Sequence, residues 1–419
     1  MIYDILIIGG GISGIRVGIE ILKQYPHLSC CIAEAYHIAG GRIFTFQSTI
    51  PRIGAVQWES GAGRISTTHT RTLGLLTHYG LTTYPISGDA MYMDNHTVNK
   101  NQFSSLQHTY LTPLRSLSPD ILRTHTLGEV STMVLGANES ARLFNMFPYW
   151  SEIHTVRADH ALHSFDHEMK SMSGFVGCVE GLSSLIDGMM NEYSKLGGKI
   201  HYNTKATSVS TQQDNIIRVD TSVNTYMCRS CILAVPSEAL KHIRGISTLP
   251  VLNHLRMNPL LRMYAVFPVS HGKSWFSGLS KIVTSDRIRF FIPIDESKGI
   301  VMISYTDGND ALFWAKKDKK KIQNDVMKHI RAMFPEHDIP EPLFFKMHMW
   351  KNGCTYWKPG SYDISAESTQ SLHPFPKIHP NLFLCGESFS ESPCWVESAL
   401  IQADRLLHHR SFTSVLTKL

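Results

Sequence analysis

The feature that most constrains the fold is a glycine-rich turn at Gly9–Gly14, which reads Gly-x-Gly-x-x-Gly. It follows the apolar run Ile5–Ile8 and precedes a helical pattern that continues through Leu22, and a second apolar run then ends at the acidic residue Glu34. Strand, turn, helix and acidic residue at this spacing are the fingerprint of a dinucleotide-binding βαβ unit. The sequence therefore predicts a Rossmann-type nucleotide-binding domain of the α/β class.

Each residue type in this turn has a physical reason. Gly9 permits the tight turn, Gly11 lets the backbone approach a pyrophosphate, and Gly14 allows the helix to pack closely on the strand. The free N–H groups at the start of the helix would receive the phosphates, and the Glu34 carboxylate would accept hydrogen bonds from the ribose hydroxyls. The predicted nucleotide contacts of this unit are Gly9, Gly11, Ile12, Ser13, Gly14, Glu34 and Ala35.

A second pair of glycines favours FAD over NAD. Gly40 and Gly41 are followed by Arg42, and together they come shortly after Glu34, where they could close over the same pyrophosphate. The chain has no second Gly-x-Gly-x-x-Gly at a strand–helix junction, which a nicotinamide site would need. We therefore expect one permanently held dinucleotide, FAD, and no nicotinamide site.

Composition excludes several classes of function. The chain has 419 residues, of which 43% are hydrophobic and 18% are charged, which is typical of two or three folded domains. The net charge of +5 is small and scattered, so nucleic acid is not an expected partner. The sequence shows no signal peptide and no apolar run of about 18 residues, which predicts a soluble, cytoplasmic protein without a membrane contact. The eight irregularly spaced cysteines fit reduced thiols.

Further blocks of sequence follow the pattern of one family. They are Trp58–Ile65, Phe175–Leu185, Lys205–Val209, Ile232–Pro236, Asn381–Glu387 and Ser392–Ala399. With the glycine turns, these blocks resemble the FAD-dependent amine oxidases, the group of monoamine, polyamine and L-amino-acid oxidases. The resemblance spans nearly the whole chain. It implies an α/β fold in which a Rossmann-type FAD-binding domain (GR2-like) is joined to a discontinuous α+β substrate domain.

The resemblance also implies contacts to the cofactor. In the family, the segment matching Gly61–Arg64 passes close to the flavin ring, and the residue matching Ala206 holds the adenine through its backbone. Glu387 matches a residue near the ribityl and pyrophosphate groups, and a helix starting near Val396 would face the flavin pyrimidine oxygen with its N–H groups. The contacts expected in this way are Gly41, Arg42, Gly61, Ala62, Gly63, Arg64, Ala206, Val235, Gly386, Glu387, Trp395 and Val396.

Two aromatic residues are expected at the substrate cavity. Trp395 matches a wall position where the family usually has Tyr or Trp, and a core aromatic under a helix cap is the alternative. Tyr356 is the expected second wall, with Trp357 as the other candidate. Cys354 lies where monoamine oxidases carry the cysteine that joins the flavin covalently. The spacing to Pro359-Gly360 is shorter here, so a buried free thiol is the alternative.

One substitution bears on the activity. Most active oxidases of the group place a Lys over the flavin N5 atom, and the comparable strand here carries Arg262. A guanidinium stays charged, so it can orient water and attract superoxide but cannot take a proton. Arg262 could also bind a substrate carboxylate in bidentate fashion, which favours an amino acid, or form a structural ion pair. Arg262, Trp395 and Tyr356 are the expected catalytic residues.

The expected reaction needs few protein groups. An aromatic cage holds a neutral amine or amino acid, and a hydride passes from the carbon next to nitrogen to the flavin N5 atom. Water hydrolyses the resulting imine, and oxygen regenerates the flavin with release of hydrogen peroxide. The partners are thus a small-molecule substrate and oxygen, and a homodimer is one option for the oligomeric state. No metal is expected, because His160, His163 and His167 have helical spacing but no cysteine or carboxylate completes a ligand set.

Two other functions remain open at this point. The same fold serves flavin desaturases and porphyrinogen oxidases, which act on carbon–carbon or ring bonds. The Lys-to-Arg change at Arg262 also allows a non-catalytic, FAD-binding structural or interaction protein.

The nucleotide motifs divide the chain into two expected domains. Segments 1–84, 170–243 and 341–419 carry them and are expected to form the FAD-binding domain. Segments 85–169 and 244–340 lack them and are expected to form the substrate-binding domain, with strands at Ile288–Ile294 and Gly299–Tyr305 and a helix around Ala311–Phe334. The flavin ring would lie at the junction.

Overall fold

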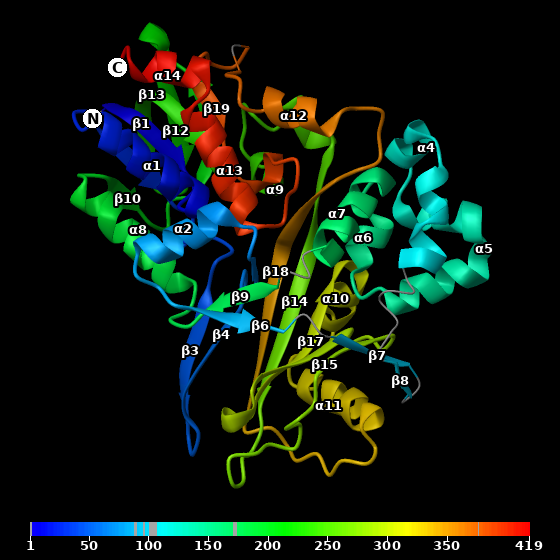
Figure 1. Cartoon of the computed structure of the whole chain (residues 1–419). Helices are drawn as coiled ribbons and strands as arrows, with labels where there is room; N and C mark the ends of the chain where they lie inside the picture. The colour runs from blue at the N-terminus through cyan, green and yellow to red at the C-terminus, as the bar shows by residue number, and fades with distance from the viewer. Residues whose placement is uncertain (1, 88–89, 95–96, 100–106, 171–173, 376) are drawn as a thin grey trace.

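The N-terminal strand β1 (Ile2–Ile8) lies inside a mostly parallel sheet of the computed structural model, which describes residues 2–87, 90–94, 97–99, 107–170, 174–375 and 377–419 (Figure 1). β1 pairs in parallel with β2 and β13, and β10 and β19 extend the parallel part. β12 and β11 continue the sheet in antiparallel register. The partner strands are β2 (Cys30–Ala33), β10 (Lys199–His201), β11 (Ala206–Thr211), β12 (Ile217–Thr221), β13 (Thr225–Leu233) and β19 (Leu382–Leu384). The predicted βαβ unit is confirmed.

Both faces of this sheet are covered, which explains the continuous apolar run of β1. Ile5 and Ile7 pack into one core with five helices, and Leu6 and Ile8 pack into a second core on the other face. The helices on the first face are α1 (Ile12–Gln24), α2 (Thr70–His78), α8 (Ser183–Lys195), α13 (Val396–Leu407) and α14 (Arg410–Leu416). α1 and α13 lie side by side although they come from opposite ends of the chain (Figure 1). The short helices α9 (Ser237–Leu240) and α12 (Ile364–Gln370) contribute to the second core.

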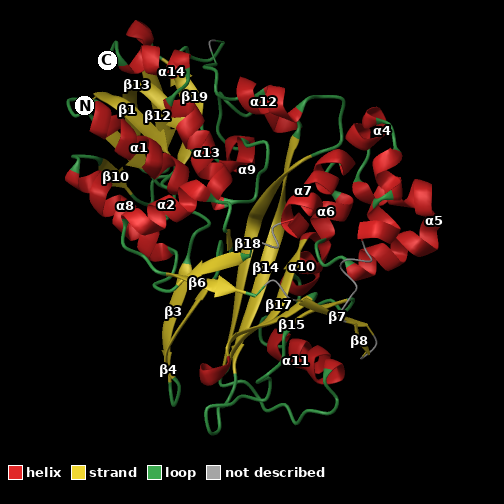
Figure 2. Ribbon diagram, viewed as in Figure 1, coloured by secondary structure: helices red, strands yellow, loops and turns green. Residues whose placement is uncertain are grey.

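A second sheet is built around two long antiparallel strands, β14 (Leu255–Val266) and β18 (Phe344–Trp357). They run through the middle of the molecule (Figure 2). The sheet continues from β14 through β17 (Ile300–Asp307), β16 (Phe290–Asp295), β15 (Lys281–Thr284), β7 (Ala90–Asp94) and β8 (Thr97–Asn99). Helices α10 (Gly308–Ala315) and α11 (Ile322–Met333) share a buried apolar core with this sheet.

The remaining elements are a group of helices, a hairpin and a small sheet. Helices α4 (Pro119–Thr124), α5 (Leu127–Met146), α6 (Trp150–His154) and α7 (Ala158–Lys170) gather beside the second sheet (Figure 2). The hairpin of β3 (Thr45–Ile50) and β4 (Gly54–Glu59) projects from the first sheet, and a small sheet joins β5 (Ile65–Ser66), β9 (Phe175–Cys178) and β6 (Thr83–Ile86). The segment between β4 and β5, residues 60–64, connects the hairpin to the small sheet.

The expected single helix around Ala311–Phe334 is wrong, because the chain forms α10 and α11 with a lysine-rich turn between them. Asp318 makes this turn: its side chain accepts a hydrogen bond from the Lys320 N–H at 2.9 Å, and its carbonyl accepts from Lys321 at 2.9 Å. Local acceptors of this kind compete with helical hydrogen bonds.

The two-domain division stays a prediction. Every strand of the first sheet comes from the segments expected to bind FAD. However, β18 also belongs to segment 341–419, and it pairs with β14 in the second sheet.

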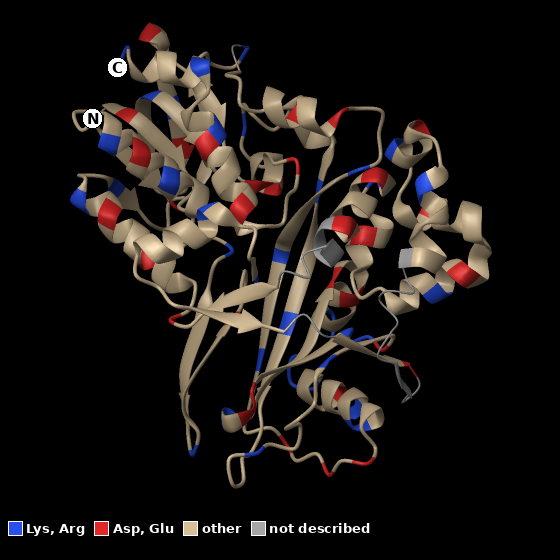
Figure 3. Ribbon diagram, in the orientation of Figure 1, with Lys and Arg blue, Asp and Glu red and all other residues tan. Residues whose placement is uncertain are grey.

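Charged residues of both signs are interspersed over the elements (Figure 3). Within the described part of the chain, no helix is long and apolar enough to cross a membrane.

Candidate active site

The glycines of the first turn are fixed by close backbone contacts. A Cβ atom on Gly9, whose φ is +106°, would lie 2.5 Å from the Ala234 carbonyl oxygen, and one on Gly14 would lie 2.2 Å from the Gly9 carbonyl oxygen. Gly11 differs, because no atom outside its neighbours lies within 4 Å of the place where its Cβ would be. The turn is therefore packed tightly at both ends and open in the middle.

The opening lies at the start of α1. Gly11 is the residue that caps this helix, and it makes no side-chain cap hydrogen bond. The first N–H groups of a helix have no partner within it, so those of α1 can bind an anion. Gly40 forms a bridge with Gly11, and Gly41 lies against the Gly11 backbone. The second glycine pair thus borders the same opening, as expected. The Ser13 hydroxyl donates instead to the Ala399 carbonyl at 3.0 Å and ties α1 to α13.

Glu34 lies buried beside this turn. Its Oε2 accepts from the Gly10 N–H at 2.7 Å and its Oε1 accepts from the Tyr36 N–H at 2.8 Å. Burial raises the pKa of Glu34, and the backbone donors offset only part of this effect. A carboxylate has about four acceptor positions, so Glu34 can still accept from a ribose hydroxyl. Of the other expected contacts, Ala35 is exposed and Ala206 is buried at the start of β11.

Arg42 and Glu387 form an ion pair that the sequence did not predict. The two atoms Arg42 Nη2 and Glu387 Oε2 are 2.6 Å apart, and Arg42 Nη1 also donates to the Gly353 carbonyl at 3.1 Å. Burial opposes ionisation of Glu387, but the charge of Arg42 and the N–H donors outweigh it, so the pKa of Glu387 is lowered. The second oxygen, Oε1, accepts from the Cys394 N–H at 2.9 Å. Both charges are therefore present at neutral pH.

The segment 60–64 runs next to this ion pair. The Ala62 N–H donates to the Arg42 carbonyl at 3.0 Å, and a Cβ on Gly61 would lie 2.0 Å from the same oxygen. A Cβ on Gly63 would lie 2.5 Å from Glu59 Cβ. The two glycines are therefore needed for the close passage of the backbone between its neighbours.

Arg262 reaches this segment from β14. Its Nη1 donates to the Glu59 carbonyl at 3.0 Å, and the guanidinium lies 4.8 Å from the centre of the Tyr305 ring. Burial opposes the charged form, but Tyr264 and Tyr305 outweigh it, and the pKa of Arg262 is raised above the ordinary value. The acceptor is a backbone carbonyl, so this contact is not the ion pair considered from the sequence.

Trp395 stands at the start of α13, where it is half-buried. Its ring is nearly parallel to that of Phe175, with the ring centres 6.2 Å apart, and His69 approaches it edge-on at 5.0 Å. The Arg64 guanidinium lies 4.3 Å from the Phe175 ring centre and 5.5 Å from that of Trp395. Trp395 thus lies in a partly open cluster with a cation, rather than in a closed apolar core.

Tyr356 lies apart from that aromatic cluster. It packs with Ile153 and Leu127 of the helical region, next to Cys354 and Cys394. Among the described rings, those of Trp395 and Tyr356 are not in contact, so their joint role as a cage stays a proposal. Trp357 points to the opposite face of β18, where it is fully buried and donates to the Ser390 carbonyl at 2.9 Å.

Cys354 and Cys394 are free thiols that lie near one another. Cys394 has φ +77° and its Sγ donates to the Thr355 carbonyl at 3.1 Å. Burial, with the neighbouring Cys354, raises the pKa of Cys394 well above the ordinary value. The covalent attachment considered for Cys354 stays a prediction.

The histidines of α7 do not share one environment. His160 is half-buried, its Nε2 contacts the Glu391 carbonyl at 2.8 Å, and burial lowers its pKa to about 4. His163 is exposed, and the side chain of His167 is outside the described part. Within that part, no three histidine, cysteine or acidic side chains gather to hold a metal ion.

Comparison with known proteins decides the family. A family profile described as flavin containing amine oxidoreductase matches residues 12–406. The chain belongs to this family, and its cofactor is FAD. No curated protein sequence matches it significantly.

Solved structures of similar proteins share the fold. Cyclohexylamine oxidase from Brevibacterium oxydans IH-35A is 17% identical with a TM-score of 0.76, covering 100% of this chain and 99% of that one. Putrescine oxidase bound to putrescine is 14% identical with a TM-score of 0.73, covering 97% and 98%. A protein named "Putative protoporphyrinogen oxidase" from Exiguobacterium sp. 255-15 is 16% identical with a TM-score of 0.74, covering 100% and 99%.

The residues of this flavoprotein fit FAD. The open position at Gly11 would be filled by any side chain, and Gly386, whose φ is +126°, likewise has open space where a Cβ would be. These positions, the uncapped start of α1 and the acceptors of Glu34 suit the pyrophosphate and ribose of a dinucleotide. Val235, which lies within 2.9 Å of a Cβ on Gly9, borders the same turn.

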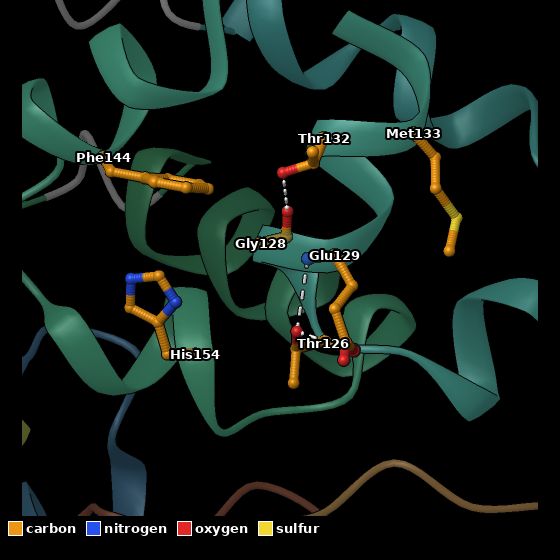
Figure 4. A pocket seen from close by; sticks show the side chains of 7 residues that line it. All are labelled: Thr126, Gly128, Glu129, Thr132, Met133, Phe144 and His154. Atoms are coloured by element: carbon orange, nitrogen blue, oxygen red, sulfur yellow. Dashed lines mark hydrogen bonds between the residues drawn. The ribbon is translucent and has the colours of Figure 1, made fainter. Parts of the chain in front are cut away.

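A depression on the surface lies elsewhere in this amine oxidoreductase. It has a volume of about 570 Å³ and is bordered by α5 and α6, with the rings of Phe144 and His154 on one side (Figure 4). Thr126 and Glu129 cap α5 at its edge (Figure 4). None of its lining residues is among the expected site residues.

The sequence did not predict the side chains of β14 and β18 that lie next to residues 60–64. Tyr264 follows Arg262 by two positions on β14, and His348 and Trp350 have the same spacing on β18. Residues two apart share one face of a strand, and Arg262 pairs with His348 in the sheet. Polar residues at alternate positions of these two strands are the sequence pattern that could have identified these side chains.

Proposed function

We propose that this protein is an FAD-dependent oxidase of a small amine or amino acid. The observation that carries the proposal is one continuous set of contacts. It leads from the open start of α1 at Gly11, through Gly40–Arg42 and the buried Glu387, to residues 60–64 and Trp395. A dinucleotide bound at Gly11 would extend along this set to the junction of the two sheets, where Trp395 meets Arg64.

The proposed roles of the chain follow from these contacts. The N-terminus of α1 neutralises the pyrophosphate, and the Glu34 carboxylate accepts from the ribose. The Arg42–Glu387 pair fixes the loops on either side of the cofactor. Trp395, the residue that caps α13, makes no side-chain cap hydrogen bond, and the N–H groups at this helix start would face the flavin pyrimidine, where negative charge develops. The other residues that the sequence predicts as FAD contacts are proposed as FAD contacts here too.

The proposed chemistry is a two-electron oxidation. Bound FAD supplies the acceptor for a hydride from the carbon next to nitrogen, and oxygen restores it with release of hydrogen peroxide. The chain orients the substrate: Trp395 forms one wall, and Tyr356 forms the second. Arg64 and Arg262 are cations close to the site, so they disfavour a protonated amine and favour the neutral form. A substrate carboxylate would be attracted by the charge of Arg64 beside Trp395.

The cellular location, the absence of other partners, the oligomeric state and the covalent flavin are also proposals. The described cysteines are all free thiols, which supports a reducing, cytoplasmic setting. The interspersed charges support neither nucleic acid nor membrane as a partner (Figure 3). A homodimer is proposed and is tested by the mass of the protein in solution. For Cys354, the intact mass after acid denaturation separates a covalent flavin adduct from a free thiol.

The proposal is tested by product analysis in air. We expect a panel of primary amines, polyamines and L-amino acids to yield hydrogen peroxide, together with the aldehyde or keto acid of one class. A quaternary ammonium analogue of the best substrate is the matched control, because it has no lone pair to form an imine and must give no product. Peroxide release without any carbonyl product would contradict amine oxidation.

A further inference from the structure

The backbone at the end of β4 receives three side-chain hydrogen bonds. The Glu59 carbonyl accepts from Arg262 Nη1 at 3.0 Å and from the Tyr264 hydroxyl at 2.7 Å. The Ser60 carbonyl accepts from Trp350 Nε1 at 2.7 Å. These donors come from β14 and β18, so the second sheet holds two successive carbonyls at the end of the β3–β4 hairpin.

A histidine completes this contact from the same face of β18. His348 Nε2 accepts from Trp58 Nε1 at 3.0 Å, and the Ser60 hydroxyl lies 3.3 Å from the same nitrogen. Burial, with the charges of Lys346 and Arg262, lowers the pKa of His348 to about 4, so its ring is neutral and can accept. The Trp58 ring is stacked between Phe46 at 4.7 Å and Tyr264 at 4.9 Å.

The opposite side of the loop is held by the segment between β2 and β3. The Ser60 N–H donates to the Phe44 carbonyl at 2.9 Å, and the Ala62 N–H donates to the Arg42 carbonyl at 3.0 Å. Residues 59–62 are therefore fixed from both sides, and the donors from the second sheet define how far they reach into the junction.

One amino group of the Arg262 guanidinium is committed to this contact. Nη1 is used on the Glu59 carbonyl, the plane lies against the Tyr305 ring, and Nε is buried without a hydrogen-bond partner. A planar, delocalised cation can make the ring contact and the hydrogen bond together, whereas an ammonium group is a point charge on a flexible stem.

We propose that Arg262 is a positioning residue, which holds the Glu59–Arg64 segment at the flavin site through the Glu59 carbonyl and does not touch the substrate. Tyr264, Trp350 and His348 act with it as one clamp on this segment. The functional importance of the clamp rests on the proposed place of residues 60–64 beside the flavin. The clamp itself rests on the hydrogen bonds.

Three variants of the full-length flavoprotein test this proposal. Arg262→Met removes the donor and the charge, Arg262→Lys keeps the charge alone, and Arg256→Met removes an exposed charge from the same strand as a matched control. Hydrogen exchange of the Ser60 and Ala62 amides reports the order of the loop. We expect exchange on the order of tenfold faster in Arg262→Met, less gain in Arg262→Lys and none in Arg256→Met.

Kinetics separate positioning from substrate binding. A positioning role lowers kcat for a plain amine and for an amino acid by similar factors. Unchanged exchange in Arg262→Met, with a rise in KM for the carboxylate-bearing substrate alone, would overturn the proposal and make Arg262 a carboxylate ligand. If no amine is turned over, the proposed function is wrong. The hydrogen exchange result still shows whether Arg262 holds the segment. Should Arg262→Met not fold, Tyr264→Phe removes a donor to the same carbonyl and must also speed exchange, or the clamp is wrong.

Discussion

Arg42 Nη2 and Glu387 Oε2 lie 2.6 Å apart, and they join two loops separated by 345 residues in the chain. Glu387 is 6% exposed, whereas Arg42 keeps part of its side chain in contact with the surface. The pair connects the glycine loop after β2 with the turn after β19, so both edges of the proposed cofactor site depend on it.

Replacing Glu387 by Gln should therefore destabilise the protein strongly. Loss of one partner leaves a mostly buried guanidinium without its counter-charge, which costs about 3 kcal/mol of unfolding free energy. The pKa of Glu387 is lowered in the folded state, so its stabilisation is present above the ordinary carboxyl pKa and is lost as the pH falls through the folded value. Chemical denaturation at neutral and acidic pH should show the deficit of Glu387→Gln shrinking in acid.

Glu391→Gln is the matched control for that measurement. Glu391 is paired with Arg405 at 3.4 Å but is 49% exposed, and such surface pairs contribute roughly 0–1 kcal/mol. Equal losses in the two variants would mean that the buried pair has no special importance.

Two glycine substitutions in the first turn should have different effects. Gly11→Ala meets open space and an ordinary φ of −75°, so the protein should fold with an unchanged Tm but bind FAD at least about tenfold more weakly. Gly14→Ala places a Cβ 2.2 Å from the Gly9 carbonyl and should destabilise the fold itself. FAD content and the Tm of the apoprotein measure the two effects. A fully flavinylated Gly11→Ala protein would contradict the proposed pyrophosphate position.

The lowered pKa of His348 predicts a loss of stability in mild acid. Burial first, and then the nearby cations, lower its pKa from 6.5 to about 4 in the folded protein. Between these values the unfolded chain binds a proton that the folded protein does not, so stability falls as the pH is lowered, by up to about 1.4 kcal/mol per pH unit. Denaturation curves of His348→Asn should be flatter than wild type over this interval. Parallel curves would show that His348 does not titrate in this way.

Trp395→Leu tests the substrate wall. The substitution removes the ring beside Phe175 and Arg64, and we expect kcat/KM to fall by about tenfold or more while FAD remains bound. Trp357→Phe is the control on the adjacent strand, because it removes a buried hydrogen bond to Ser390 and should lower Tm without raising KM. Unchanged turnover in Trp395→Leu would argue strongly against an aromatic wall at this position.

The nucleotide-binding half could be predicted from the sequence because its constraints are local. The spacing of Gly9, Gly11, Gly14 and Glu34 within one βαβ unit specifies a turn, a helix start and an acceptor, and the structure places them together. The family blocks likewise identified Arg42 and Glu387. Their ion pair was not predicted, because the local sequence around each residue does not identify a charged partner far away in the chain.

The substrate side could not be predicted to the same depth. The contacts of Trp395 with Phe175 and Arg64, and of Arg262 with the Glu59 carbonyl, join residues that are far apart in sequence and depend on how β14, β18 and α13 pack. The helix expected around Ala311–Phe334 is wrong for a local reason, because the acceptors of Asp318 compete with helical hydrogen bonds and form a turn.

The most direct test of the account is the visible spectrum of the purified protein under anaerobic conditions, recorded before and after addition of amines, polyamines and L-amino acids. We predict a yellow protein whose flavin absorbance is bleached by members of one of these classes, which would establish the reaction and name the substrate class together. A yellow protein that none of them bleaches would contradict amine oxidation, and would favour a flavin desaturase, a porphyrinogen oxidase or a non-catalytic flavoprotein instead.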